Sequence, residues 1–135
     1  MSEYMYPKYT KVAAEVEGLI FPYGGPEYHG GCARFSELDL KTLRKIVDLT
    51  EGELLAEYHN DSPTIEEILD HHEKDSEVLV SGYVIEASRT DCRLTVDGIL
   101  VPEDRPLIEK YVKTCSDFEN EEIIDGSGYR RYWWD

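Results

Sequence analysis

The spacing of apolar residues changes along the chain and predicts helices in its middle and strands after them. In the first helical segment, apolar residues recur at three- and four-residue intervals: Leu40, Leu43, Ile46 and Val47. This spacing indicates an amphipathic helix that ends near Leu49. Ser36 is the expected N-cap, with Asp39 in the position that closes a capping box and Phe35 placed to pack on the first turn.

A second helix is expected to begin at Ser62, with Pro63 in its first turn, and to end near Lys74. Its inward face is formed by Ile65, Ile68, Leu69 and His72. Between the two helices, residues 53–58 fit either a helical turn or a short strand. Nearer the start of the chain, alternating apolar positions predict a strand over residues 12–17. The Gly- and Pro-rich residues 22–31 predict a loop.

From residue 78 onwards the pattern favours strands. Residues 78–85 are apolar on both faces, which is typical of a central strand covered on two sides. Residues 92–96 alternate between apolar and polar, so one face of that strand should be wet. The Asp97-Gly98 pair before residues 99–101 is the strongest hairpin signal in the chain, because both residue types tolerate a type I′ turn. We therefore expect a three-stranded meander.

The remaining segment predicts one more helix and a closing hairpin. Asp104 is the expected cap of this helix, with Pro106 in its first turn. An apolar stripe should pack it on the meander: Leu107, Ile108, Tyr111, Val112 and Cys115. Residues 123–134 are interpreted as a last hairpin or an edge strand. The elements together predict a single α+β domain over residues 1–135, with a small, mainly antiparallel sheet of four to six strands packed against about three helices.

Composition adds a strong constraint on partners. The chain has 29 acidic and 14 basic residues among 135, a formal net charge of −15. A field of this sign repels nucleic acid and anionic membranes and attracts basic surfaces. The three cysteines, Cys32, Cys92 and Cys115, show no CxxC pairing, which favours a reducing compartment and hence the cytoplasm. We expect neither a signal peptide nor a membrane-spanning segment.

The negative charge is concentrated in residues 36–77, which hold 13 acidic and 4 basic residues. Four carboxylates of the second predicted helix recur at intervals of four, three and four residues: Glu66, Asp70, Glu73 and Glu77. If the helix extends to Glu77, these side chains form one stripe. Such a row would bind Lys and Arg of a partner and imitate a nucleic-acid backbone. The alternative is an ordinary solvated helix face.

Other candidate sites are weaker. His29 and Cys32 have a spacing that suits half of a zinc site, but no second close pair completes it. The same two residues could pair a thiol with an imidazole, or could be an ordinary loop cysteine near a surface histidine. We assign no catalytic residue, metal ligand or cofactor, since the chain has no GxSxG, HExxH or P-loop motif. At the C-terminus, three aromatic residues beside arginines could anchor an interface or be buried: Tyr132, Trp133 and Trp134.

The leading hypothesis is a non-enzymatic cytoplasmic interaction protein whose acidic helix binds a basic protein surface. The partner would be a nuclease or another nucleic-acid-binding protein, with no direct contact to nucleic acid or membrane. In acidity and size the chain is similar to the DNA-mimic inhibitors that phages and mobile elements direct against restriction and CRISPR nucleases. This similarity is one of composition, covers no motif and assigns no residue. Two alternatives remain: a small enzyme or ligand- or metal-binding domain using the loop around His29 and Cys32, and a structural homodimer joined through the aromatic C-terminus.

Overall fold

The computed structural model describes residues 13–24, 30–85, 93–105, 107, 109–123 and 127–134. Five antiparallel strands form one sheet in the order β1-β2-β3-β5-β4. The strands are β1 (Cys32–Asp39), β2 (Leu79–Ile85), β3 (Arg93–Pro102), β4 (Asp117–Ile123) and β5 (Ser127–Trp133). The helices are α1 (Ala13–Ile20), α2 (Leu40–Leu49), α3 (Ile65–His72) and α4 (Glu109–Thr114), with the 3-10 helices η2 (Phe21–Tyr23) and η3 (Glu53–Ala56). The α+β class predicted from the sequence is confirmed.

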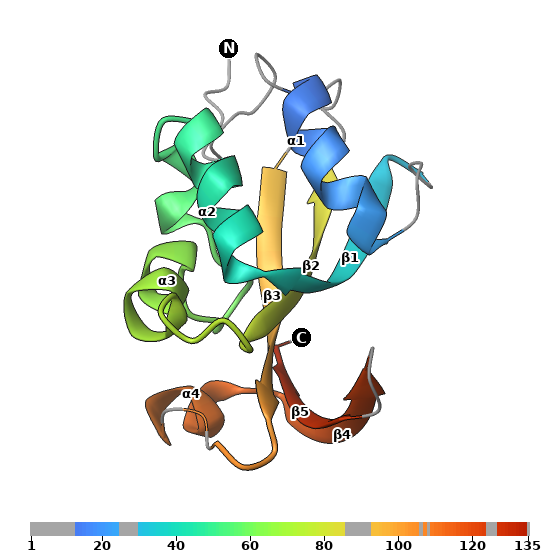
Figure 1. Ribbon diagram of the computed structural model, residues 1–135. Coiled ribbons are helices and arrows are strands. Elements are labelled where there is room, and N and C mark those ends of the chain that lie inside the picture. Colours follow the sequence, from blue (N-terminus) through green and yellow to red (C-terminus); the bar gives the residue numbers. More distant parts are fainter. Residues whose placement is uncertain are drawn as a thin grey trace.

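The sheet has one face packed against helices. Figure 1 shows α1, α2 and α3 along one side of the sheet, with α4 below α3. Alternate strand residues join the helices in the main core, among them Val80, Val84, Leu94, Val96, Ile99 and Val101. We call this side the helix face. Because side chains alternate along a strand, the intervening residues point to the opposite side, which we call the pocket face.

The predicted hairpin at Asp97-Gly98 is wrong, because residues 93–102 form one continuous strand. In the pairing with β2, Ser81 lies opposite Gly98 and Gly82 lies opposite Val96. Asp97 is therefore the extra residue of a β-bulge. The expected wet face of residues 92–96 is also absent from the described part of this strand, since Thr95 is only 1% exposed.

The predicted strand over residues 12–17 is also wrong from residue 13 onwards, where α1 begins; Val12 lies outside the described residues. Val16 and Ile20 are four residues apart, so they share one side of a helix, and both are buried in the core. Over so short a segment, the alternation of apolar residues did not distinguish a strand from a helix.

Both central helices were predicted, but each begins later than expected. Strand β1 continues to Asp39, so Asp39 rather than Ser36 caps α2, its carboxylate accepting the Thr42 N–H at 2.6 Å. Helix α3 is capped by Thr64 rather than Ser62, in a capping box with Glu67. The segment left open after α2 contains η3.

The last elements follow the prediction in outline. Helix α4 begins at Glu109, so Asp104 does not cap it and instead lies in an exposed turn after β3. Strands β4 and β5 pair as the closing hairpin. Strand β5 also pairs with β3, so it is not an edge strand. Its inner position brings the C-terminal aromatic residues into the centre of the molecule.

Candidate functional site

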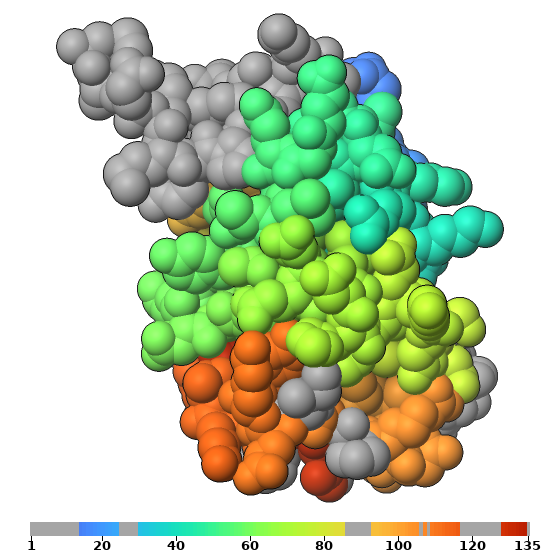
Figure 2. Space-filling view, turned by 90° about the vertical axis from the view of Figure 1, so that its left-hand side faces the viewer, coloured from blue at the N-terminus to red at the C-terminus, as the bar shows by residue number. Residues whose placement is uncertain are grey.

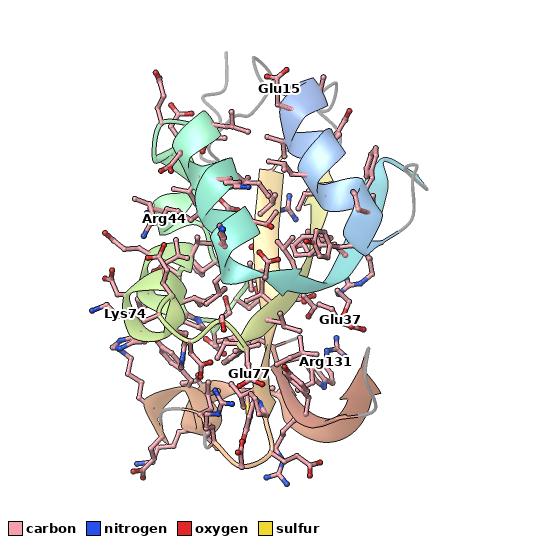
Figure 3. The ribbon with its side chains drawn as sticks, viewed as in Figure 1. Glu15, Glu37, Arg44, Lys74, Glu77 and Arg131 are labelled. Carbon is pink, nitrogen blue, oxygen red and sulfur yellow. The ribbon has the colours of Figure 1, made fainter. Side chains whose placement is uncertain are left out.

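The four carboxylates singled out in the sequence do not form one helical row. Glu66 and Asp70 lie one turn apart on α3 and are both exposed. The helix ends at His72, so Glu73 is its C-cap and Glu77 lies outside it, in the turn before β2. Figure 3 shows Glu77 below the ribbon of α3, near the start of β2. Because α3 does not extend to Glu77, the four carboxylates do not form the continuous stripe that the sequence predicted.

Glu73 and Glu77 are bound by arginines of this chain. Arg44 of α2 donates from Nε and Nη2 to the two carboxylate oxygens of Glu73, both at 2.8 Å. These bonds hold the pKa of Glu73 below its usual value. Arg105 binds Asp75 at 2.7 Å and also contacts Glu77. These pairs connect the end of α3 to α2 and to the turn after β3, so their first role is structural.

Other carboxylates of this region form no ion pair with a residue in the described part of the chain. Exposed carboxylates with no ion pair to a described residue are Asp48, Glu51, Glu53, Asp61, Glu66 and Asp70. We call this set the acidic face. The acidic face extends over α2, η3 and α3. These elements lie on the side of the molecule that is turned toward the viewer in Figure 2. Asp48 and Asp70 both act on Arg44 and raise its pKa, which places them around the same guanidinium.

The aromatic C-terminus is mostly internal. Tyr132 is 6% exposed and Trp134 is 2% exposed, and both belong to the main core. The indole N–H of Trp134 donates to Thr114 Oγ1 at 3.1 Å, and its backbone N–H donates to the Asp97 carbonyl at 2.9 Å. Of the three predicted anchor residues, only Trp133 is partly exposed.

A pocket that the sequence patterns did not reveal lies on the pocket face. Its volume is about 380 Å³, and its lining residues are Arg34, His59, Tyr83, Asp97, Arg131, Trp133 and Trp134. They come from β1, β2, β3, β5, the residue after β5 and the loop after η3. Pairing of the strands explains their meeting, because Arg34 lies opposite Tyr83 and Gly98 lies opposite Trp133.

Polar contacts fix several side chains of this pocket. Arg34 Nη2 donates to the Asp97 carboxylate at 2.8 Å, and Ser81 Oγ donates to its other oxygen at 3.4 Å. The Tyr83 hydroxyl accepts from Arg93 at 3.2 Å and lies 3.0 Å from His59 Nδ1. The Tyr83 hydroxyl therefore connects Arg93 of β3 to His59 of the loop after η3. The pocket wall is thus a connected polar network.

Glu57 is a buried carboxyl that interacts electrostatically with Arg93, an arginine of this network. It is only 4% exposed, and burial raises its pKa to about 7, while the positive charge of Arg93 acts in the opposite direction. A buried carboxyl whose pKa lies near 7 is common in functional sites, and structural networks of charged residues also contain such groups. No pattern along the chain singled out Glu57, because its burial depends on the loop that connects η3 to α3.

The candidate site around His29 and Cys32 is only partly described. His29 lies outside the described residues, and Cys32 is a half-buried free thiol at the start of β1. Within the described segments, no cluster of three or more His, Cys, Asp or Glu side chains could hold a metal ion. In the same segments, no helix combines the length and apolar character that crossing a membrane requires.

Comparison of the chain with protein-family models, with curated proteins and with solved structures gives no match. Function must therefore be argued from the two surfaces that the fold creates. One is the acidic face over the helices, and the other is the arginine- and aromatic-lined pocket on the sheet.

Proposed function

We propose that this protein is a non-enzymatic cytoplasmic interaction protein whose acidic face binds a basic surface of another protein. The observation that carries the proposal is the contrast between neighbouring carboxylates. Glu73 and Glu77 are bound by arginines, whereas Glu66 and Asp70 are exposed without an ion pair to a described residue. Like charges four residues apart weaken a helix by roughly 0.2–0.5 kcal/mol, and lysines or arginines of a partner would relieve this repulsion.

The partner that suits this face is a protein that normally binds nucleic acid. Glu66 and Asp70 lie one helical turn apart, which is about 6 Å along the axis. Together with the other carboxylates of the acidic face they offer a series of negative charges to a surface adapted to phosphates. The net charge of −15 would also speed association with such a surface by roughly 10- to 1000-fold at low salt. We infer an inhibitor that occupies the nucleic-acid channel of a nuclease or a related enzyme.

The cytoplasmic location is part of the same proposal. Cys32 and Cys115 are free thiols, a state that a reducing compartment maintains. Neither thiol is needed for the acidic face to act, so the location and the binding surface can be tested separately.

Affinity capture from the native cell can test the role of the acidic face. The Glu66→Gln/Asp70→Asn variant is compared with Glu15→Gln/Glu103→Gln, which removes the same charge from two other exposed positions. Glu15 lies at the top of α1 in Figure 3, away from α3. We expect the native protein and the control variant to retain a nucleic-acid-handling protein at low salt. The acidic-face variant should lose it, and high salt should release it.

A competition experiment then distinguishes mimicry from general charge attraction. If the protein occupies a nucleic-acid channel, excess duplex DNA should displace it from the captured partner. Binding that survives both high salt and the Glu66→Gln/Asp70→Asn change would contradict the proposal. Binding that responds to salt but not to duplex DNA would retain the acidic face as a docking surface and reject the nucleic-acid channel as its target.

A further inference from the structure

Tyr58, in the loop between η3 and α3, is the one large apolar side chain that is exposed among the described residues. Its exposed fraction is 57%, whereas the other aromatic side chains whose burial is described are buried or half-buried. Isolated apolar residues are common on protein surfaces, so exposure alone assigns no role to Tyr58. Its role depends on how the loop holds it and on the charges beside it.

The residues on both sides of Tyr58 fix the backbone from which it projects. Glu57, before it, is only 4% exposed, and its carbonyl accepts the Ile65 N–H at 3.0 Å. His59, after it, donates its N–H to Ser62 Oγ at 2.8 Å, and its carbonyl accepts the Ser62 N–H at 2.9 Å. Tyr58 therefore extends from a loop that is already ordered. A partner that binds there loses less affinity to the ordering of this protein's backbone.

Two members of the acidic face flank Tyr58 along the chain. Glu53 precedes it in η3, and Asp61 follows it in the turn that leads to α3. Both are exposed, and neither forms an ion pair with a residue that the structure describes. Because η3 also packs against α3, the two carboxylates belong to segments that lie together at the surface. An aromatic ring is thus exposed between two negatively charged segments.

A guanidinium group is the cation that combines both kinds of contact. It is planar and less strongly hydrated than an ammonium group, so it can stack on a ring while its N–H groups donate to carboxylates. Arginines of this chain show the two contacts separately. The Arg93 guanidinium lies over the Tyr83 ring, 5.4 Å from its centroid. Arg44 donates two hydrogen bonds of 2.8 Å to the carboxylate of Glu73.

We propose that Tyr58, Glu53 and Asp61 form a binding site for an arginine side chain of the partner. The guanidinium stacks on the Tyr58 ring and donates to the flanking carboxylates. A lysine keeps its attraction to the carboxylates but loses most of the stacking, so Tyr58 makes the acidic face select arginine over lysine. This inference rests on the proposed function, because it names the side chain that the basic partner presents.

Two defined peptides test this preference without the native partner. One is a short capped peptide that alternates glycine and arginine, and the other has lysine in place of each arginine. The full chain is titrated with each peptide at low salt, and calorimetry measures the dissociation constants. We expect the arginine peptide to bind about twofold to fivefold more tightly than the lysine peptide, which corresponds to one exposed cation–π contact.

Variants connect the preference to the proposed contacts. Tyr58→Ala and Tyr58→Leu should each weaken the arginine peptide about twofold to fivefold and remove most of its advantage over the lysine peptide. Tyr58→Phe keeps the ring and should keep the preference. Glu53→Gln/Asp61→Asn should weaken both peptides. Glu66→Gln/Asp70→Asn should also weaken both, with the ratio of the two dissociation constants unchanged. Circular dichroism checks that each variant is folded.

The outcomes separate this site from the proposed function. Equal affinity of the native protein for the two peptides would overturn the arginine site, as would an arginine preference that Tyr58→Ala leaves unchanged. If Glu66→Gln/Asp70→Asn then still weakens both peptides, the acidic face stands without the arginine site. If that variant binds both peptides like the native protein while Tyr58→Ala loses the preference, the arginine site stands and the role of Glu66 and Asp70 is rejected. Binding of neither peptide would overturn both proposals.

Discussion

Glu57 shows how one buried residue can make the stability of this protein depend on pH. The backbone carbonyl of Glu57 accepts the Ile65 N–H at 3.0 Å, which connects the loop after η3 to the start of α3. The Glu57 side chain also lies in the interior and is almost fully buried. Burial disfavours the charged carboxylate and raises its pKa to about 7.

The direction of the pH effect follows from the two states. Below pH 4.5, the usual pKa of this carboxyl, it is protonated whether the chain is folded or unfolded. Between pH 4.5 and about 7, only the unfolded chain releases the proton, so the folded state loses stability as the pH rises. Above that range the folded state carries the full cost of a buried charge. We therefore expect Glu57→Gln to raise the free energy of unfolding by about 2 kcal/mol more at pH 8 than at pH 4.

Urea denaturation of the native protein and of Glu57→Gln at both pH values measures this difference. Glu53→Gln, an exposed glutamate of η3, is the control and should show no such pH dependence. If Glu57→Gln changed the free energy of unfolding equally at pH 4 and pH 8, the raised pKa of Glu57 would be contradicted.

At the same scale, the helix caps show where sequence reasoning loses precision. Ser36 and Asp39 are both good cap residues three positions apart, and local chemistry alone does not choose between them. Pairing decides, because β1 continues alongside β2 until Asp39 lies opposite Leu79. Similarly, Thr64 prevails over Ser62 because Ser62 binds the His59 N–H and the Pro63 carbonyl instead.

At the scale of elements, Asp97-Gly98 is the clearest case of a local signal overruled by tertiary structure. The pair favours a tight turn, but a turn there would separate residues 98–102 from their partners on β2 and β5. Keeping the strand continuous pairs residues 98–100 on both sides. Gly98 then allows neighbouring side chains to pack closely against the strand, and Asp97 is the extra residue of the bulge. Strand order could not be derived from the sequence, because β5 reaches β3 from about thirty residues further along the chain.

Insertion of two glycines between Asp97 and Gly98 tests the continuity of β3. A hairpin turn would accept them, whereas a continuous strand would shift residues 98–102 by about 7 Å against both neighbours. We expect a loss of about 3 kcal/mol or more in the free energy of unfolding. The same insertion between Glu103 and Asp104, in the exposed turn after β3, should cost about 1 kcal/mol or less. Equal tolerance of the two insertions, measured by urea unfolding, would contradict the continuous strand.

At the scale of the whole molecule, the sequence located one surface and missed the other. The acidic excess of residues 36–77 correctly indicates that the negative charge lies on the helical side of the molecule. The four predicted carboxylates nevertheless do not form one row, because α3 ends at His72. The pocket was missed because its residues extend from Arg34 to Trp134, and no spacing along the chain links them. The one local sign was the alternation at the C-terminus, which places Arg131 and Trp133 on the same side of a strand.

The acidic face also predicts how the stability of the whole molecule responds to salt. Raising the ionic strength from 0.01 to 0.15 M shortens the screening length from about 30 Å to about 8 Å. Repulsion among the exposed carboxylates then weakens, while close pairs such as Arg44 and Glu73, at 2.8 Å, lose less of their attraction. We therefore expect the melting temperature of the native protein to rise by roughly 2–5 °C over this range.

If the acidic face is the source of this rise, Glu66→Gln/Asp70→Asn should melt at a higher temperature than the native protein at 0.01 M salt and gain less on adding salt. Glu15→Gln/Glu103→Gln removes the same charge and should keep more of the salt response, because its two positions are not one turn apart on a helix. A melting temperature that falls with salt would mean that ion pairs such as Arg105 with Asp75 outweigh the repulsion. The acidic face would then have no strain for a basic partner to relieve, and attraction at long range would be its remaining contribution to binding.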